Sequence, residues 1–288
     1  MNIIKNSRLT AASLLLACSL TGCTETKSTP TPVPTPPPAA EVNADPRNYA
    51  DYTELVWSDE FAGSSLDGTK WGYDQGGGGW GNNELETYTN STNNVYLSSG
   101  SLVIKSIQSG NSYTSGRILT KGKKDFKFGR IDIRAKLPKG KGIWPAIWML
   151  GSDIDQNNWP RCGEIDIMEL RGSRPKELLT TMHFGTAPGG PSTKGQRGIT
   201  QTQANDLSDA FHVYSIVRSR DQIRIFLDEQ QIYSFGPSDA TPFAYPFNNP
   251  FFMVLNLAVG GDFDGNPDAT TTFPQQMEVD YVRYLQYK

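Results

Sequence analysis

Three carboxylates lie within one short apolar stretch of the sequence, Gly163 to Leu170. The stretch has the composition of a buried β-strand, and Glu164, Asp166 and Glu169 interrupt it. Ionised side chains in an apolar element are costly unless they are paired, so we expect a chain that keeps three of them there to use them in chemistry. The alternative is an edge strand with a solvated acidic face.

A regular strand does not place the three carboxylates on one face. Side chains alternate, so Glu164 and Asp166 share a face and Glu169 points the other way. A one-residue bulge near Ile167 and Met168 would return Glu169 to the face of the other two. The glutamate Cα atoms would then lie roughly 13 Å apart. Side chains leaning together would narrow this to the range in which two carboxyls flank a glycosidic bond, a spacing that leans toward retention without deciding it.

The sequence lacks the residues that zinc, thiol, serine-triad or phosphate-loop sites require. The sequence has only two histidines, His183 and His212, and Cys162 is the one cysteine after residue 45, so neither a zinc cluster nor a paired-thiol site can be built. No Gly-x-Ser-x-Gly motif accompanies the histidines. Gly76–Gly81 lacks the Lys-Ser/Thr end of a phosphate loop. With Trp80, it fits a loop that shapes a cleft, or else an ordinary surface loop.

The elements that position the three carboxylates are predicted to be mostly short strands. Alternating or β-branched runs predict strands at Leu102–Ile107, Gly129–Leu137, Ile143–Leu150, Gln222–Leu227, Phe251–Val259 and Glu278–Tyr284. The one helical suggestion is brief, around Thr202–Phe211. This pattern favours an all-β sandwich of two packed antiparallel sheets.

Two of these runs are apolar on both faces, as expected of strands that line a cleft. Within Ile143–Leu150, Trp144 and Trp148 share a face with an alanine between them. Two such indoles would form a flat platform for sugar rings, and the alternative is that both are buried in the core. Within Phe251–Val259 the single polar residue is Asn256. A buried asparagine needs hydrogen-bond partners, and a ligand hydroxyl would serve.

The first 44 residues indicate export. Residues 1–22 combine Lys5 and Arg8 with an apolar run too short to span a bilayer, which predicts a lipoprotein signal peptide. Cys23 after Leu-Thr-Gly resembles the lipidated cysteine of a bacterial lipobox, and the alternative is ordinary secretion with Cys23 unmodified. Residues 23–44 form a Pro/Thr-rich linker. We therefore expect a cell-envelope lipoprotein held to a membrane only by an N-terminal lipid.

Residues 45–288 predict a single domain. They show no second change in composition and no repeat, and their number is ordinary for a β-sandwich. A formal net charge of −3, from 27 basic and 30 acidic residues, gives no electrostatic footprint for nucleic acid. We expect a neutral polysaccharide as partner and a monomeric chain.

At several separated places the sequence resembles glycoside hydrolase family 16, and within that family the bacterial laminarinases. The matching motifs are Trp57–Phe61, Gly79–Leu85, Tyr113–Ile118, Gly142–Leu150, Trp159–Glu169, Leu255–Gly261 and Val279–Val282. They cover nearly all of the domain, and Glu-Ile-Asp-Ile-Met-Glu is the most specific. The resemblance implies a β-jelly-roll sandwich with an open concave substrate cleft, and endo-hydrolysis with retention.

The resemblance also implies roles for individual residues. Glu164 would be the nucleophile, Glu169 the acid and then the base, and Asp166 an auxiliary that keeps one glutamate ionised and the other protonated. Asn82 could take the place of Asn83 among the implied substrate contacts. Those contacts are Asn83, Arg117, Trp144, Trp148, His183 and Asn256.

Many family members also hold a structural calcium ion away from the cleft. The corresponding positions here are Glu60, Gly100 and Asp280, whose oxygen atoms suit calcium, and the alternative is an empty site. We expect no cofactor for catalysis. One departure from the family pattern is Gly116, where many relatives carry alanine.

These observations predict an exported endo-β-1,3-glucanase that acts on laminarin-like glucans, with mixed-linkage β-1,3/1,4-glucans as further candidate substrates. One alternative is a hydrolase of agar or carrageenan, although sulfated galactans would favour a more basic cleft. The other is a glucan-binding protein of the same fold, although such proteins lack the catalytic glutamates.

Overall fold

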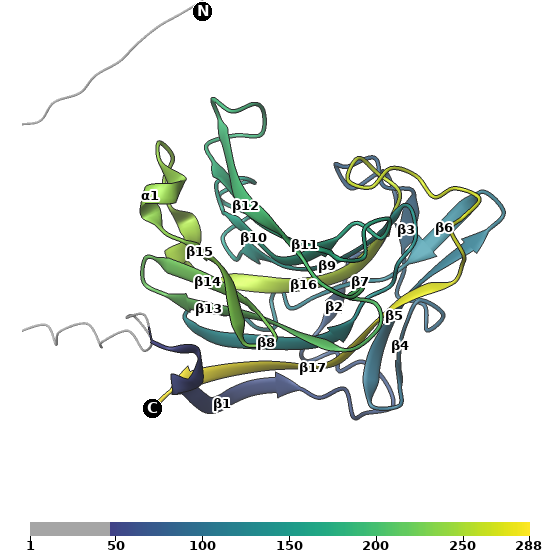
Figure 1. Ribbon diagram of the computed structural model, residues 1–288, viewed down its shortest axis with the longest axis horizontal. Coiled ribbons are helices and arrows are strands. Elements are labelled where there is room, and N and C mark those ends of the chain that lie inside the picture. The colour runs from purple at the N-terminus through teal and green to yellow at the C-terminus, as the bar shows by residue number, and fades with distance from the viewer. Residues whose placement is uncertain (1–46) are drawn as a thin grey trace, which may run out of the picture. The chain divides into compact units, whose positions relative to one another are not determined.

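Two stacked β-sheets make up the domain (Figure 1). The computed structural model describes residues 47–288. The predicted signal peptide at 1–22, the linker at 23–44 and the lipidated Cys23 lie outside the described residues. Within residues 47–288, no helix combines the length and the apolar character needed to cross a membrane.

The sheet that carries the catalytic-type carboxylates, here named the cleft sheet, has the strand order β12-β11-β10-β9-β16-β7-β2. Its strands are β2 (Gly72–Tyr73), β7 (Arg117–Leu119), β9 (Ile143–Gly151), β10 (Glu164–Leu170), β11 (Glu177–Gly185), β12 (Lys194–Thr202) and β16 (Phe251–Val259). In Figure 1 this sheet curves, with β12 rising at one side and the loops beside β3 at the other.

The second sheet, here named the outer sheet, has the order β15-β14-β13-β8-β17-β5-β6-β3, with β1 paired to β17 and β4 to β5. Its strands are β1 (Tyr52–Asp59), β3 (Glu86–Tyr88), β4 (Val95–Ser98), β5 (Ser101–Ser109), β6 (Ser112–Ser115), β8 (Gly129–Lys136), β13 (His212–Ser219), β14 (Gln222–Leu227), β15 (Gln230–Phe235) and β17 (Gln275–Tyr287). The β3–β6 pair is parallel, and every other strand pair of the described residues is antiparallel.

Alternation along the strands explains why the two sheets pack. In β8, Ile131 and Ile133 are buried while Arg130 and Arg134 are partly exposed. Burial of such apolar faces stabilises a sandwich by roughly 25 cal/mol per Å² of apolar surface removed from water. The inner faces of β9 and β10 join the same core through Ile143, Ile147, Met149, Ile165, Ile167 and Met168. The predicted all-β sandwich is confirmed.

The predicted bulge in β10 is present. From Asp166 to Glu169 the strand advances by three residues while its partner β11 advances by two. The two intervening side chains, Ile167 and Met168, are both fully buried. Two successive residues therefore point into the core, and Glu169 returns to the face of Glu164 and Asp166.

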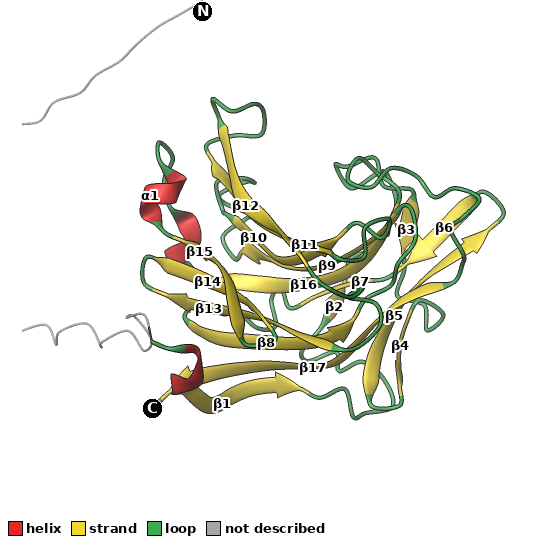
Figure 2. Ribbon diagram, in the orientation of Figure 1, coloured by secondary structure: helices red, strands yellow, loops and turns green. Residues whose placement is uncertain are grey.

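Among residues 47–288, helical structure is confined to short segments (Figure 2). They are η1 (Tyr49–Asp51), α1 (Pro237–Ala240) and η2 (Pro246–Asn248). The helix suggested around Thr202–Phe211 is therefore wrong. Past the end of β12 the segment forms turns instead, because its backbone is tied to a neighbouring loop: the N–H of Leu207 donates to the carbonyl of Pro175, and Leu207 is buried.

Gly116 precedes β7 in a space too small for the alanine that many relatives carry. A Cβ at this position would lie 2.4 Å from Val95 Cγ2 and 3.1 Å from Ile104 Cγ2. We expect Gly116→Ala to lower the free energy of unfolding by about 1–3 kcal/mol, because both neighbours are β-branched and stiff. Equilibrium urea unfolding measures this loss. The loss should be smaller in a Val95→Ala background, and equal losses in both backgrounds would contradict the proposed clash.

Candidate active site

A cleft of about 310 Å³ lies on the cleft sheet and is floored by β9, β10 and β16. Four indole rings line it, together with the three carboxyl groups of β10 and a fourth, Glu84, from the loop before β3. The lining residues are Trp80, Gly81, Asn82, Glu84, Arg117, Trp144, Ala146, Trp148, Leu150, Ile154, Trp159, Glu164, Asp166, Glu169 and Asn256. The three carboxylates of β10 thus open into one cleft with most of the predicted sugar contacts.

His183 lies opposite the first two carboxylates. It pairs across the sheet with Glu164, one strand away on β11. Its Nε2 lies 3.6 Å from Glu164 Oε1 and 3.2 Å from Asp166 Oδ2. Asp166 is 4% exposed. The imidazole thus contacts both carboxyl groups, which fits the predicted position of His183 beside the catalytic strand.

Trp144 is directed at Glu169. Its indole Nε1 donates a hydrogen bond of 3.1 Å to Glu169 Oε1. Phe263 stacks on the same indole with ring centroids 4.7 Å apart. One face of Trp144 is therefore covered by protein, and its N–H orients a carboxyl group. Trp144 and Trp148 both line the cleft, and the two-indole platform stays a prediction.

Trp148 is held against a cation. The Arg117 guanidinium lies 4.8 Å from the Trp148 ring and 4.7 Å from the Trp80 ring, and its Nε is 2.9 Å from Asp74 Oδ2. Cation–π contacts of this kind favour a fixed stack. Arg117 lines the cleft as predicted, and its guanidinium contacts two indoles, one from the loop and one from β9. It therefore fastens the glycine-rich loop that carries Trp80 to the sheet.

Asn256, a predicted sugar contact, lines the cleft and finds hydrogen-bond partners within the protein. Its Oδ1 accepts a hydrogen bond of 2.6 Å from Trp148 Nε1, and its Nδ2 donates one of 3.0 Å to the Tyr88 hydroxyl. The side chain is 5% exposed. The buried asparagine finds its partners within the protein, so no ligand hydroxyl is needed to satisfy it.

The structure also places Asn82, rather than Asn83, in the cleft. Asn83 has a φ of 59°, in the left-handed region. Its Nδ2 donates to both carboxylate oxygens of Asp262 at 3.1 Å. The turn of the glycine-rich loop thus directs Asn83 toward a neighbouring loop. Asn82 Nδ2 instead donates a hydrogen bond of 2.8 Å to Glu84 Oε1 at the cleft.

Burial raises the pKa of each carboxyl on β10. It lifts the pKa of Glu164 to about 8, with the charge of Asp166 adding to the shift and His183 opposing it. It likewise raises the pKa of Glu169 to about 8, with the charge of Asp166 adding to it, and the pKa of Asp166 to about 8. Burial therefore disfavours a state in which all three groups are ionised at neutral pH. This suits a site that needs one carboxylate and one carboxylic acid together.

The same cluster has the spacing of a small cation site. Ligand atoms of Glu164, Asp166 and His183 all lie within 4.8 Å of one another. Direct contact between the imidazole and the two carboxyl groups explains the spacing equally well. Two-carboxylate glycoside hydrolysis needs no metal.

The positions implied for calcium lie on neighbouring segments of the outer sheet, namely the end of β1, the β4–β5 turn and β17. Their side chains do not fit the ion. Arg283 makes hydrogen bonds of 3.0 and 2.7 Å to Glu60, and Arg134 makes one of 2.6 Å to Asp280. Both carboxylates are thus engaged by guanidinium groups, which leaves Gly100 as the one implied ligand without a cation on it.

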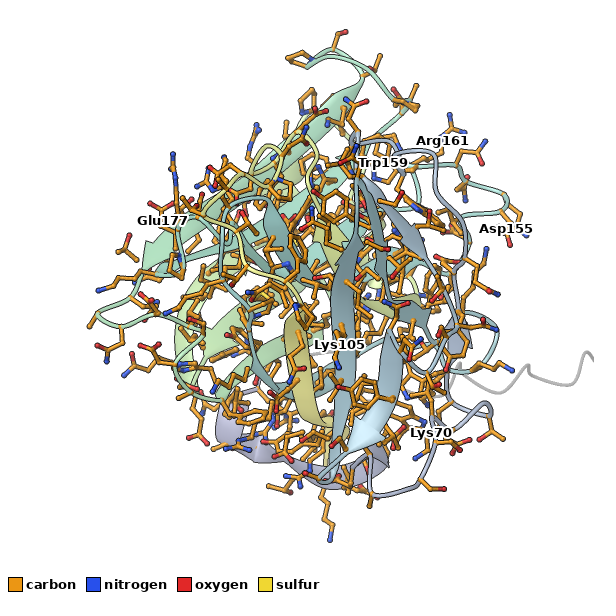
Figure 3. The ribbon with its side chains drawn as sticks, turned by 90° about the vertical axis from the view of Figure 1, so that its right-hand side faces the viewer. Lys70, Lys105, Asp155, Trp159, Arg161 and Glu177 are labelled. Carbon is orange, nitrogen blue, oxygen red and sulfur yellow. The ribbon has the colours of Figure 1, made fainter. Side chains whose placement is uncertain are left out.

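Trp159 is a cleft residue that reasoning from the sequence did not assign. It is half-buried, lines the cleft and has Lys194 Nζ 5.1 Å from its ring. Figure 3 shows it near Arg161 toward the top of the molecule, with Lys70 toward the base. Its position five residues before Glu164 was an available signal, since a short loop keeps such a residue near the strand.

Comparison with known proteins identifies the family. The model for "Glycosyl hydrolases family 16" matches residues 81–283. The chain belongs to this family. A glucan endo-1,3-beta-glucosidase A1 from Niallia circulans is 44% identical over 260 residues, which cover 80% of this chain and 37% of that protein. A beta-glucanase from Rhodothermus marinus is 41% identical over 262 residues, which cover 85% of this chain and 90% of that protein.

A solved structure supports the same assignment. The laminarinase catalytic domain from Thermotoga maritima MSB8 superposes with a TM-score of 0.75 at 39% identity, covering 83% of this chain and 99% of that one. The match extends over almost the whole of that catalytic domain. Glycoside hydrolases cleave the glycosidic bond with two carboxyl groups, and this chain presents two such groups on one face of an open cleft.

Burial of these carboxyls predicts how stability depends on pH. Because the folded-state pKa of Glu164 lies above its ordinary value of 4.5, the stability that comes from its neutral form is complete below pH 4.5 and is lost as pH rises through about 8. Glu164→Gln is neutral at every pH. We therefore expect the variant to be more stable than the unaltered protein at pH 9, by at least about 1 kcal/mol, with little difference at pH 4.

Thermal melts from pH 4 to pH 9 measure this effect. Glu54→Gln, at an exposed position of β1, serves as the control because it removes no buried carboxyl. A Glu164→Gln difference that stayed flat across the pH range would contradict the described burial.

Proposed function

We propose that this protein is an endo-β-1,3-glucanase that hydrolyses laminarin-like glucans with retention of configuration, and that it also cleaves mixed-linkage β-1,3/1,4-glucans. The observation that carries the proposal is the bulge in β10. It sets Glu164 and Glu169 on one face beneath a cleft lined by indoles. The relatives named as glucan endo-1,3-beta-glucosidase and laminarinase support the choice of substrate.

The proposed mechanism is a double displacement. Glu164 attacks the anomeric carbon and forms a covalent glycosyl intermediate while Glu169 protonates the leaving oxygen. Because Trp144 occupies Oε1 of Glu169, the transferable proton resides on Oε2. Glu169 then removes a proton from water, which releases the sugar from Glu164. His183 opposes the rise in the pKa of Glu164, which favours the ionised nucleophile, and the charge of Asp166 raises the pKa of Glu169, which favours the protonated acid.

The lining of the cleft argues against sulfated galactans as substrates. Four acidic residues line it, and its one basic residue, Arg117, is paired with Asp74. A sulfated polymer would meet net negative charge there. A glucan-binding protein without activity is also disfavoured, because both glutamates are present and face the cleft. The neutral glucan therefore remains the favoured ligand.

We also propose that the protein is an envelope lipoprotein. The apolar run, Cys23 and the Pro/Thr-rich residues up to 44 support this proposal, and all of them precede the described residues. A tether of this kind would hold the catalytic domain away from a membrane, where it could reach a large polymer.

Product analysis tests the proposed function. We expect reducing ends from laminarin and from lichenan, a mixture of oligosaccharides early in the reaction, and none from agarose. Proton NMR of the first products should show the β-anomer before mutarotation, since retention preserves configuration. Absence of reducing ends from laminarin would refute the substrate assignment, and an initial α-anomer would refute the double displacement.

The roles of the two glutamates can be separated with a second substrate. Glu164→Gln should reduce hydrolysis of laminarin by a factor on the order of 10³ or more, while laminarin binding persists. Glu169→Gln should lose activity on laminarin but form the glycosyl intermediate from an aryl β-glucoside whose leaving group needs no proton. Glu164→Gln should fail on both substrates. Normal hydrolysis by Glu164→Gln would show that the nucleophile lies elsewhere.

A further inference from the structure

A second pair of carboxyl groups lies buried beside the cleft, away from the catalytic strand. Glu84 is 8% exposed and lines the cleft, and Glu86 on β3 is 1% exposed. Glu86 Oε2 accepts a hydrogen bond of 2.7 Å from the N–H of Val259. The double displacement uses neither residue, yet burial of two neighbouring acids carries a cost. Their connections to the cleft indicate what they do.

A continuous chain of hydrogen bonds joins Glu84 to Trp148. The Tyr88 hydroxyl lies 3.1 Å from Glu84 Oε2, Asn256 Nδ2 lies 3.0 Å from that hydroxyl, and Trp148 Nε1 lies 2.6 Å from Asn256 Oδ1. Tyr88 and Asn256 are both buried. The Glu84–Trp148 chain, as these four residues are named here, therefore runs through the interior from one wall of the cleft to its floor.

The chemistry of the indole fixes the direction of every hydrogen bond in the chain. Trp148 Nε1 can only donate, so the atom of Asn256 that it meets must be the carbonyl oxygen. The amide nitrogen of Asn256 then faces Tyr88 and donates to its hydroxyl oxygen. The single hydroxyl proton of Tyr88 is consequently directed at Glu84. The chain is satisfied only if Glu84 presents an acceptor.

The chain ends on β9, the strand that pairs with the catalytic strand. Trp148 pairs with Asp166 across the β9–β10 ladder, and it is half-buried. Its N–H is fixed by Asn256, and the Arg117 guanidinium lies 4.8 Å from its ring on one side. An indole held at its edge and by a cation over its ring has a fixed orientation, and this ring also lines the cleft.

We propose that Glu84 is a positioning residue for substrate binding, which fixes the Trp148 indole against the sugar by terminating the Glu84–Trp148 chain. Glu84 acts through Tyr88 and Asn256 rather than by reaching the reacting atoms. Asn82, whose amide donates to the other oxygen of Glu84, holds the carboxyl group in place from the loop side. The inference rests on the proposed glucanase activity and specifies how its cleft is ordered.

Glu86 suits this arrangement as the neutral member of the pair. Burial raises its pKa to about 8, and the neighbouring Glu84 adds to the shift. A protonated Glu86 spares the pair a second buried negative charge at neutral pH. Glu84 can then remain an acceptor for its two donors.

A double-mutant cycle between Glu84 and Trp148 tests the proposal. Glu84→Met removes the acceptor with little change in volume, and we expect it to raise KM for laminarin about tenfold with kcat within about twofold. Glu84→Gln keeps an oxygen for Tyr88 and should restore most of the affinity. In a Trp148→Phe background, which has no indole N–H to orient, Glu84→Met should change KM by less than about twofold. Equal effects in both backgrounds would overturn the proposal, because Glu84 would then act on the sugar directly.

Tyr88→Phe provides a second route if Glu84→Met does not fold. It breaks the chain at its centre without changing shape, and it should raise KM as Glu84→Met does. Tyr284→Phe is the matched control, because it removes a buried tyrosine hydroxyl that bonds to Phe128 in the outer sheet. It should leave KM unchanged, and an unchanged KM in Tyr88→Phe would overturn the proposal. Failure of the unaltered protein to cleave laminarin would instead refute the proposed function.

Discussion

One extra residue in β10 is the constraint on which the cleft depends. A strand that alternates regularly would put Glu169 in the core, where an ionisable group without partners is costly. The bulge places Ile167 and Met168 both inside, and Glu169 joins Glu164 on the open face. The apolar core of the sandwich thus holds the catalytic geometry: the bulge persists because two adjacent side chains gain more by burial than the ladder loses locally.

Indole N–H groups organise the cleft around that strand. Trp144 donates a hydrogen bond to Glu169 and Trp148 donates one to Asn256. Each bond fixes the direction in which the N–H edge of the ring points. Phe263 covers one ring and Arg117 the other. Tryptophan is suited to this because it combines a large apolar surface with a single donor. The rings are held before substrate arrives, which reduces the ordering cost of binding.

Polar groups in this cleft are arranged as two separate systems. Around β10, burial and mutual repulsion of three carboxyls leave the cluster partly protonated at neutral pH. Around Glu84, hydrogen bonds of fixed direction lead from a carboxyl to a ring of the cleft floor. The first system supplies the charge states for chemistry, and the second is proposed to supply position. Both require low exposure, because water would satisfy the same groups and release them.

Sequence patterns by themselves determined the all-β class, most strand positions, and the need for a bulge between Asp166 and Glu169, because these follow from alternation of adjacent side chains. They also indicated that Trp144 and Trp148 share a face. Only the tertiary structure decided the hydrogen-bond partners of the predicted site residues. Asn256 bonds to Tyr88 and Trp148, Asn83 bonds to Asp262, and Glu60 pairs with Arg283. Such partners lie between 108 and 223 positions apart in the chain, and local periodicity carries no information about contacts at that separation.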